Sequence, residues 1–222
     1  MAKVASMKAL LKKLGTQASK ASKNPNLQVL TQRLFEEAVA EDLAALEVSE
    51  LLDLATGGLE FLKDRKPGRP IVRLLNHEPS TGQLANVSIM EIVNDDMPFL
   101  LDSVLGLLTD RGHDISLVLH PIVNVERDRA GRLQKLVPAR TGSSTSVRES
   151  FIHIHLERIS GKAATSKLID EITTVLNHVR LSVLDWRTMQ GRMKEAVAAY
   201  QNTPPPVPVE ELTETMAFLQ WL

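Results

Sequence analysis

The chain has 222 residues, of which 43% are hydrophobic and 24% are charged, which is the balance of an ordinary soluble globular protein. Its formal net charge of −1 gives no global indication of binding to nucleic acid or to an acidic membrane surface. The lack of cysteine excludes disulfides, thiolate metal sites and a cysteine nucleophile. No apolar run approaches the roughly 18 residues that span a bilayer. We therefore expect a cytoplasmic protein with neither nucleic-acid nor membrane partners.

The first 66 residues contain a basic segment followed by helical patterns. Residues 1–26 hold six lysines and no acid before Asn24, and we expect a basic flexible tail there, with a transit peptide as the alternative. Residues 27–66 carry apolar side chains at near-helical spacing and predict two helices. The "KPGRP" stretch then breaks the chain, and "IVRLLN" over 71–76 predicts a short strand.

Strand and helix patterns alternate in the central part of the chain. They predict strands near 87–93, 115–125, 150–158 and 180–184, with helices over 98–111 and 166–177. In "ESFIHIHLERI", Ile152, Ile154 and Leu156 share one face, while His153 and His155 share the other. The order βαββαβ predicts an α+β fold, a ferredoxin-like antiparallel sheet with both helices on the face of the isoleucines. We expect the histidine face to be solvated or covered by another domain.

The predicted α+β domain occupies residues 67–185, with flanking helices on both sides of it in the sequence. A helix over 186–202 is expected to pack on this domain, with Asp185 capping its start and Trp186 packed beneath it. Residues 203–222 are expected to be an extended Pro-rich linker and the start of a following segment, whose helix has one apolar face.

The stretch "NDDMPFLLDS" places two acids before a proline and an apolar run. Proline is favoured in the first turn of a helix, and an acid before it can cap free N–H groups. We expect Asp96 chiefly to cap the helix over 98–111, and Asp95 or Asp102 to hold a neighbouring backbone or basic group. The alternative is a ligand site formed by Asn94, Asp95, Asp96 and Asp102, whose carboxylates suit a metal or an ammonium group.

Three histidines suggest a second candidate site. His153 and His155 share a strand face, and His120 lies on the neighbouring strand of the expected hairpin. Three imidazoles on one face could bind zinc or nickel. The competing interpretation is a polar sheet face without a metal.

The segment "DMPFLLDSVLGLLTDRGHDI" resembles the opening strand, turn, helix and strand of ACT domains, small regulatory modules that often bind amino acids. In that family the residue after the proline is commonly glycine, which lets a ligand approach the backbone. This sequence has Phe99 there, and a phenyl ring would obstruct the usual ligand position.

Five phrases in order resemble the N-terminal region of the large bacterial NAD-dependent glutamate dehydrogenases: "EIVNDDMPFLLDSV", "HPIVNVERDRAG", "RESFIHIHLE", "VRLSVLDWRTM" and "FLQWL". In those enzymes long ACT-like and helical segments precede a distant catalytic domain. The resemblance implies a non-catalytic regulatory or assembly segment of an oligomer whose parent enzyme uses NAD to deaminate glutamate oxidatively to 2-oxoglutarate. Its implied partners are other domains of the same longer chain or sister subunits, and an amino-acid effector.

The residues themselves favour a segment without catalytic or cofactor sites. No Gly-x-Gly-x-x-Gly motif is present, so no dinucleotide site is expected here. A hydrolase using the paired carboxylates has little support, because no base, nucleophile or oxyanion donor can be identified. The main alternative is a stand-alone amino-acid-sensing module of ACT type that binds its ligand at the turn containing Asp95 and Asp102.

Overall fold

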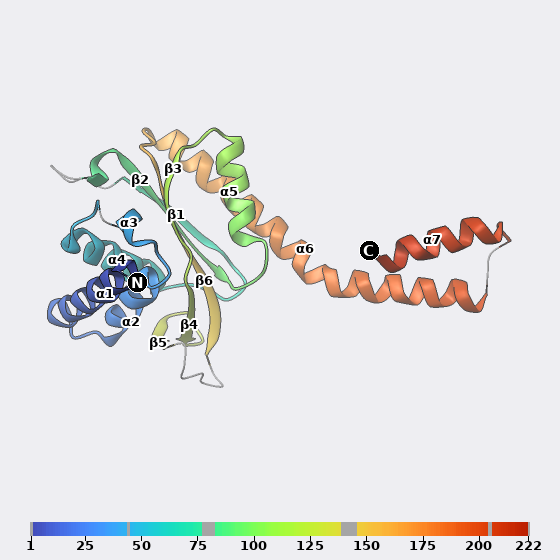
Figure 1. The fold of residues 1–222 in the computed structure, drawn as a ribbon, viewed down its shortest axis with the longest axis horizontal. Helices are drawn as coiled ribbons and strands as arrows, with labels where there is room; N and C mark the ends of the chain where they lie inside the picture. Colours follow the sequence, from blue (N-terminus) through green and yellow to red (C-terminus); the bar gives the residue numbers. More distant parts are fainter. Residues whose placement is uncertain (1, 44, 77–82, 139–145, 204–205, 222) are drawn as a thin grey trace. The chain divides into compact units, whose positions relative to one another are not determined.

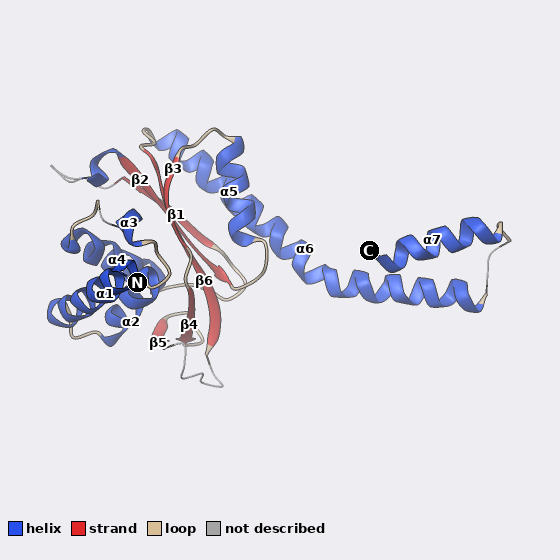
Figure 2. Cartoon of the chain, viewed as in Figure 1, coloured by secondary structure: helices blue, strands red, loops and turns tan. Residues whose placement is uncertain are grey.

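The computed structural model describes residues 2–43, 45–76, 83–138, 146–203 and 206–221. The chain forms two compact units, Met1–Asn177 and His178–Leu222. Figure 1 and Figure 2 show a sheet with helices in the first unit and a pair of helices in the second. The elements are α1 (Ala2–Ala21), α2 (Pro25–Phe35), α3 (Ala40–Leu43), α4 (Val48–Leu62), β1 (Ile71–Asn76), the short 3-10 helix η1 (Gln83–Asn86), β2 (Val87–Asp95), α5 (Leu100–Asp110), β3 (Ile115–Leu119), β4 (Ile122–Arg127), β5 (Leu133–Val137), β6 (Val147–Glu157), α6 (Lys162–Asn202) and α7 (Val209–Trp221).

The six-stranded sheet is antiparallel and is organised around β6. Its strands lie in the order β1-β2-β6-β4-β5, and β3 also pairs with β6. β3 and β4 follow one another along the same edge of β6, with Leu119 opposite His153 and Ile122 opposite Ser150. The strands predicted near 87–93 and 150–158 are confirmed, and the strand expected over 115–125 is divided into β3 and β4.

The edge of the sheet beside β2 differs from the prediction. Residues 180–184, predicted to be a fourth strand, lie inside α6, and β1 occupies the edge next to β2 instead. β1 runs antiparallel to β2, with Ile71 opposite Val93. Because β1 takes this edge, a later strand cannot pair there, and the proline-free segment 162–202 continues as helix. The α+β class and the antiparallel sheet are confirmed, and the strand over 180–184 is wrong.

One face of the sheet packs against α5 and the first part of α6 (Figure 1). Met90 and Ile92 of β2 lie on this face beside their partners Ile154 and Ile152 of β6, and all four side chains are fully buried. The two helices contribute buried apolar side chains: Leu100, Val104, Leu108, Leu168, Ile172 and Leu176. The predicted helices and their position on the isoleucine face are therefore confirmed.

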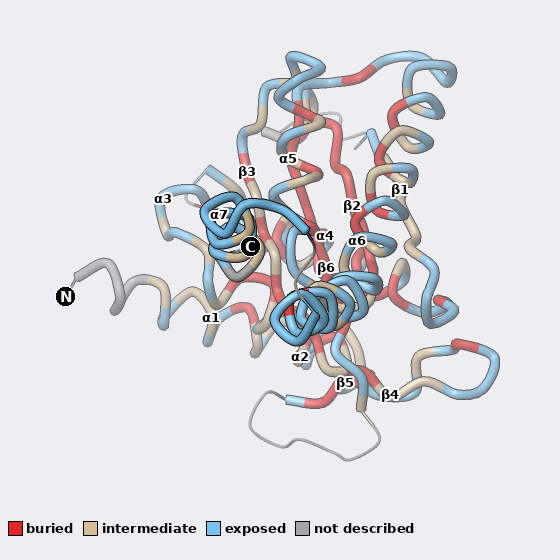
Figure 3. The backbone as a smooth tube through the Cα atoms, turned by 90° about the vertical axis from the view of Figure 1, so that its right-hand side faces the viewer, coloured by how far each residue is buried: buried red, intermediate tan, exposed pale blue. Residues whose placement is uncertain are grey.

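The opposite face is covered by α1 to α4, so helices pack on both faces of the sheet rather than on one (Figure 1). Ile89, Val93 and Phe151 of the sheet share one buried cluster with leucines of these helices. His153 and His155 lie on this face and are buried, not solvated. Figure 3 shows that the central strands are the most continuously buried part of the first unit.

The first helix replaces the flexible tail expected over residues 1–26. Met7, Leu10, Leu14 and Ala18 recur three or four residues apart, which gives α1 one apolar face. Leu14 is fully buried in the same cluster as the helices α2 and α4. Four of the lysines that suggested a tail, Lys8, Lys12, Lys13 and Lys20, are exposed on the other faces of this amphipathic helix.

The second unit consists of the distal part of α6 and of α7, which runs back beside it (Figure 1). Asp185 and Trp186 lie in the interior of α6, so the predicted cap is absent, and the Trp186 side chain is exposed rather than packed beneath a helix. Residues 204–205 of the expected linker lie outside the described residues. Among the helices that the structure describes, none is both long enough and apolar enough to cross a membrane.

Candidate functional site

The acidic turn, for which a ligand site was the alternative to a structural role, begins where β2 ends. Asn94 and Asp95 are the last residues of this strand, and their side chains point to opposite faces of the sheet. Asn94 is buried on the α5 side, opposite Ser150, while Asp95 lies opposite Glu149 on the side of α1 to α4. The structure therefore places two of the four residues of the alternative ligand site on opposite faces of the sheet.

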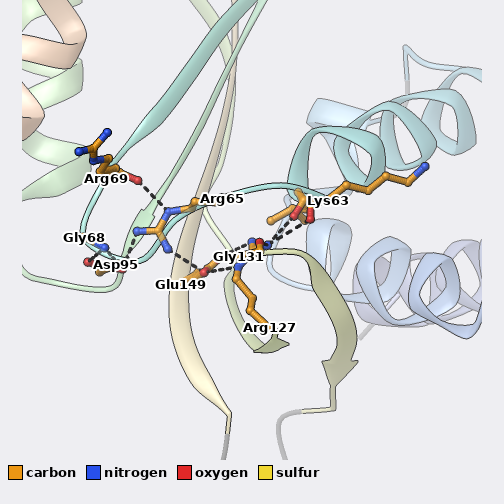
Figure 4. Close-up of polar contacts among 9 residues, drawn as sticks. Lys63, Arg65, Gly68, Arg69, Asp95, Arg127, Gly131 and Glu149 are labelled. Carbon is orange, nitrogen blue, oxygen red and sulfur yellow. Dashed lines mark hydrogen bonds and ion pairs between the residues drawn. The ribbon is translucent and has the colours of Figure 1, made fainter. Parts of the chain in front are cut away.

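Asp95 binds the guanidinium of Arg65, a residue of the segment after α4. The Arg65 side chain is fully buried. Its Nη2 donates to Asp95 Oδ1, and its Nη1 donates to Glu149 Oε1 at 2.7 Å (Figure 4). The backbone N–H of Gly68 donates to Asp95 Oδ2 at 3.0 Å. One arginine thus joins the end of β2 and the start of β6 to the loop after α4.

A second arginine, Arg127 at the end of β4, binds the same Glu149. Its Nε and Nη2 donate to the two carboxylate oxygens at 2.7 Å each, a bidentate pair (Figure 4). Its Nη1 donates to the carbonyl oxygens of Leu62 and Gly131 at 2.9 and 3.0 Å. Glu149 is fully buried, and two guanidiniums offset the cost of removing its carboxylate from water.

These four residues form a balanced set that we call the arginine–acid cluster: Arg65, Asp95, Arg127 and Glu149. It contains two cations and two anions, each hydrogen-bonded to another member. Arginine does not give up its proton in proteins, so the cluster is suited to holding strands and loops together rather than to proton transfer. Sequence reasoning missed three of its members, because Arg65 and Glu149 are 84 residues apart and carry no local signal.

The other acids of the turn have different contacts. The residue that precedes α5 as its N-cap is Phe99, and its side chain makes no capping hydrogen bond. Asp96 forms an ion pair with Arg148 at 2.9 Å, so its predicted capping role is wrong. Asp102 lies in the first turn of α5. The predicted contact of Asp95 with a basic group is confirmed, and ligand binding by the turn stays a prediction.

Phe99 has a left-handed backbone conformation, which glycine adopts more readily than any other residue. Its φ of 69° lies in the left-handed region, which glycine adopts at no steric cost. Its side chain is 65% exposed, so little packing compensates for this conformation. A phenyl ring therefore lies at the surface of a turn whose backbone is left-handed at this residue.

A second buried polar group is centred on Glu91 in the middle of β2. Arg73 Nε donates to Glu91 Oε2 at 2.6 Å, and His153 Nδ1 lies 3.1 Å from Glu91 Oε1. His153 Nε2 lies 2.9 Å from His155 Nε2. Burial raises the pKa of Glu91, but the hydrogen bond and charge of His153, together with the Arg73 guanidinium, outweigh it and hold that pKa below its ordinary value.

The third histidine does not join this group. His120 lies between β3 and β4, and its Nε2 is 2.6 Å from Ser150 Oγ, on the sheet face opposite His153 and His155. The three imidazoles therefore do not converge. Within the ranges that the structure describes, no three histidine, aspartate or glutamate side chains are placed to hold a metal ion.

Comparison with known proteins agrees with the motif phrases. A family model described as "Glutamate dehydrogenase, ACT1 domain" matches residues 30–172, which include the whole sheet and both polar groups. The NAD-specific glutamate dehydrogenase of Halomonas elongata is 31% identical over 192 residues, and that of Pseudomonas aeruginosa is 26% identical over 199 residues. These alignments cover 85% and 89% of this chain, but only 12% of each relative's length. The chain belongs to the family of glutamate dehydrogenase ACT1 domains.

Proposed function

We propose that the chain is a non-catalytic regulatory or assembly segment of an NAD-dependent glutamate dehydrogenase, positioned toward the N-terminus of the parent enzyme. The observation that carries this proposal is the family match over residues 30–172. The parent enzyme would bind NAD and deaminate glutamate to 2-oxoglutarate through other domains. Its relatives are named NAD-specific glutamate dehydrogenases, and this chain spans 12% of their length.

The contacts of the buried charges support a structural role. Glu149 accepts from two guanidiniums, and Glu91 is bonded to Arg73 and His153. A catalytic carboxylate has to reach the reacting atoms of its substrate. These two carboxylates are fully or almost fully buried and bind side chains of the protein itself.

The contacts of Asp95 also bear on the amino-acid-sensing alternative. An amino-acid ligand is held in part through its ammonium group, which a carboxylate such as Asp95 would bind. Here Arg65 and the Gly68 N–H already bind that carboxylate. A ligand at this position would have to displace a buried guanidinium, so the contacts favour assembly over sensing.

The proposal is tested with the chain alone and with a chimera. The isolated chain is mixed with glutamate and NAD, and NADH formation is followed by absorbance. The protein concentration is roughly 1000-fold higher than in an ordinary enzyme assay, so that weak activity would also be detected. We expect no NADH. In parallel, the matching segment of the Halomonas elongata enzyme is deleted or replaced by this chain.

We expect the deletion to impair assembly or the response to substrate and effectors, and the replacement to restore them. Turnover by the isolated chain would overturn the non-catalytic assignment. A deleted enzyme with unchanged subunit assembly, KM and kcat would overturn the regulatory or assembly role.

A further inference from the structure

The second unit, His178–Leu222, carries apolar side chains that two helices cannot cover. Along the distal part of α6, Trp186, Met189, Met193, Val197 and Tyr200 recur three or four residues apart and form one stripe. Of these only Val197 is buried. A helical seam of this kind is normally closed by further helices, as in a bundle.

The stripe borders an open apolar groove of about 600 Å³ within this unit. Its walls include Trp186, Met189, Met193 and Val197 of α6, and Leu219 of α7. Flexible thioethers make such a groove adaptable, and sulfur packs favourably against aromatic rings. The groove is therefore suited to an aromatic side chain.

An aromatic pair lies on another face of α7. The rings of Phe218 and Trp221 stack with centroids 6.3 Å apart and an interplanar angle of 27°. They are 58% and 80% exposed. Leu219 points into the groove, and its neighbours Phe218 and Trp221 are turned away from it by the helical repeat of 100° per residue. The pair cannot enter the groove of its own chain without unwinding α7.

We propose that this chain self-associates through the second unit, the Phe218–Trp221 pair of one copy docking into the methionine-lined groove of a second copy. The contact is reciprocal, so it closes as a two-fold dimer in which each copy supplies one aromatic pair and one groove. The inference rests on the proposed assembly role and names its partner, a second copy of this chain.

The charges of the two helices favour this pairing. The segment 178–202 of α6 carries four basic and two acidic side chains, whereas α7 carries three glutamates and no basic residue: Glu210, Glu211 and Glu214. When α7 of one copy lies on α6 of the other, opposite charges meet. Pairing of α7 with α7 would place like charges together and is disfavoured.

The exposed apolar area is of the size that a dimer needs. Four aromatic side chains of this unit are 43% to 80% exposed: Trp186, Tyr200, Phe218 and Trp221. Each aromatic side chain can bury about 150–250 Å², so covering these four would remove roughly 500 Å² per copy. With the flanking aliphatic side chains, the area approaches the ~800 Å² per partner of a standard interface.

Sedimentation equilibrium of the whole 222-residue chain tests the proposal. We expect twice the monomer mass of 24.5 kDa at micromolar concentration. Trp221→Glu and Met189→Lys should each weaken the dimer at least about tenfold, because both change the centre of the contact. The matched control is Leu184→Ser. Leu184 is about as exposed as Met189 but lies on the side of α6 opposite the stripe, so its replacement should leave the dimer intact. Far-ultraviolet circular dichroism checks that each variant stays helical.

A mixing experiment separates docking between copies from an effect within one copy. The Trp221→Glu and Met189→Lys chains are mixed at a concentration at which each alone is monomeric. They should then form a heterodimer, because the mixed pair has one unaltered contact and one contact between opposite charges. The proposal would be overturned if the wild-type chain were monomeric or if the Leu184→Ser control dimerised as weakly as the two variants. It would also be overturned if the two variants formed no heterodimer on mixing. None of these outcomes depends on glutamate oxidation, so failure of self-association is distinguishable from failure of the proposed function.

Discussion

At the scale of single residues, the neighbours Asp95 and Asp96 differ in how far the groups that their carboxylates bind are buried. Asp95 binds the fully buried Arg65 and the Gly68 N–H, whereas Asp96 pairs with Arg148, whose side chain is 67% exposed. Removing a carboxylate from a buried guanidinium leaves part of its charge uncompensated, while an exposed ion pair contributes little.

Asp95→Ala should therefore lower the free energy of unfolding by about 2–3 kcal/mol, and Asp96→Ala by no more than about 0.5 kcal/mol. Urea unfolding followed by circular dichroism measures both, with Asp96→Ala as the matched control. Equal losses would show that Asp96 has the capping role which the structure denies it.

Gly131 allows the turn between β4 and β5 to approach the segment after α4. Its φ is +89°, and a Cβ atom there would lie 2.5 Å from the carbonyl oxygen of Arg65. Gly131→Ala should cost about 2–4 kcal/mol, because it adds backbone strain and forces two chain segments apart. The control is Gly106→Ala in α5, where the new methyl group meets no atom within 4 Å and alanine favours the helix. A Gly131 variant as stable as the control would contradict the close approach.

His120 gives the folded chain a pH dependence near neutrality. Burial lowers the pKa of His120 below its ordinary value of 6.5, although the carboxylates of Asp96, Glu37 and Asp102 oppose this shift. Since the unfolded chain takes up this proton first, the stability contributed by neutral His120 is complete above the unfolded pKa and is lost as pH falls through and below it.

The stability difference between wild type and His120→Gln should therefore decrease as pH falls from about 7.5 to about 5. Unfolding free energies of the two chains at each pH provide the measurement. A difference that stays constant or increases toward acid would show that burial does not control this histidine.

At the scale of elements, the sequence pattern was informative where one side of an element meets the core. β6 was predicted because apolar side chains alternate along it, and α5 because Leu101, Val104 and Leu108 recur at helical spacing, although the structure buries Leu100 rather than Leu101 beside the other two. The segment 180–184 alternates in the same way, but its neighbours in space decide against a strand. β1 already pairs with the edge of β2, and this pairing has no signal in the local sequence.

The candidate site could be predicted only in part, for the same reason. The acidic turn was visible because its residues are contiguous, and the contact of Asp95 with a basic group was predicted from that. Its partner Arg65 is 30 residues away, and Glu149, the other carboxylate that binds Arg65, is 84 residues from that arginine. Contacts of this separation depend on the sheet bringing three chain segments together, so residue spacing alone could not identify them.

The helix α1 gives the sharpest test of an element that differs from its prediction. Leu14 is fully buried among the helices of the first unit. Leu14→Ala should cost about 2–5 kcal/mol, through lost burial and the cavity left behind. Lys12→Ala, an exposed change in the same helix, should be nearly neutral. If Leu14→Ala were also neutral in urea unfolding, residues 1–26 would be the flexible tail that their lysines suggested.

At the scale of the whole molecule, the two compact units differ in how their apolar residues are covered. The first unit encloses its sheet between helices, and the central residues of β2 and β6 are fully buried. Among the described residues of the second unit, the buried large apolar side chains are Val179 and Val197, each 8% exposed, and many others are at least half-exposed. Local stability follows buried apolar contact, so the two units should open with different free energies.

Hydrogen exchange on the intact chain should therefore show two classes of amide. Those of β2 and β6 should exchange at the free energy of global unfolding, and those of α7 and the distal part of α6 at a lower one. If the second unit is the dimer contact, raising the protein concentration should increase protection there by mass action and leave β2 and β6 unchanged. The Trp221→Glu chain should lose this concentration dependence and keep the protection of the sheet. Equal protection in both units, independent of concentration, would mean that the chain unfolds as one cooperative body and that its helical hairpin needs no partner.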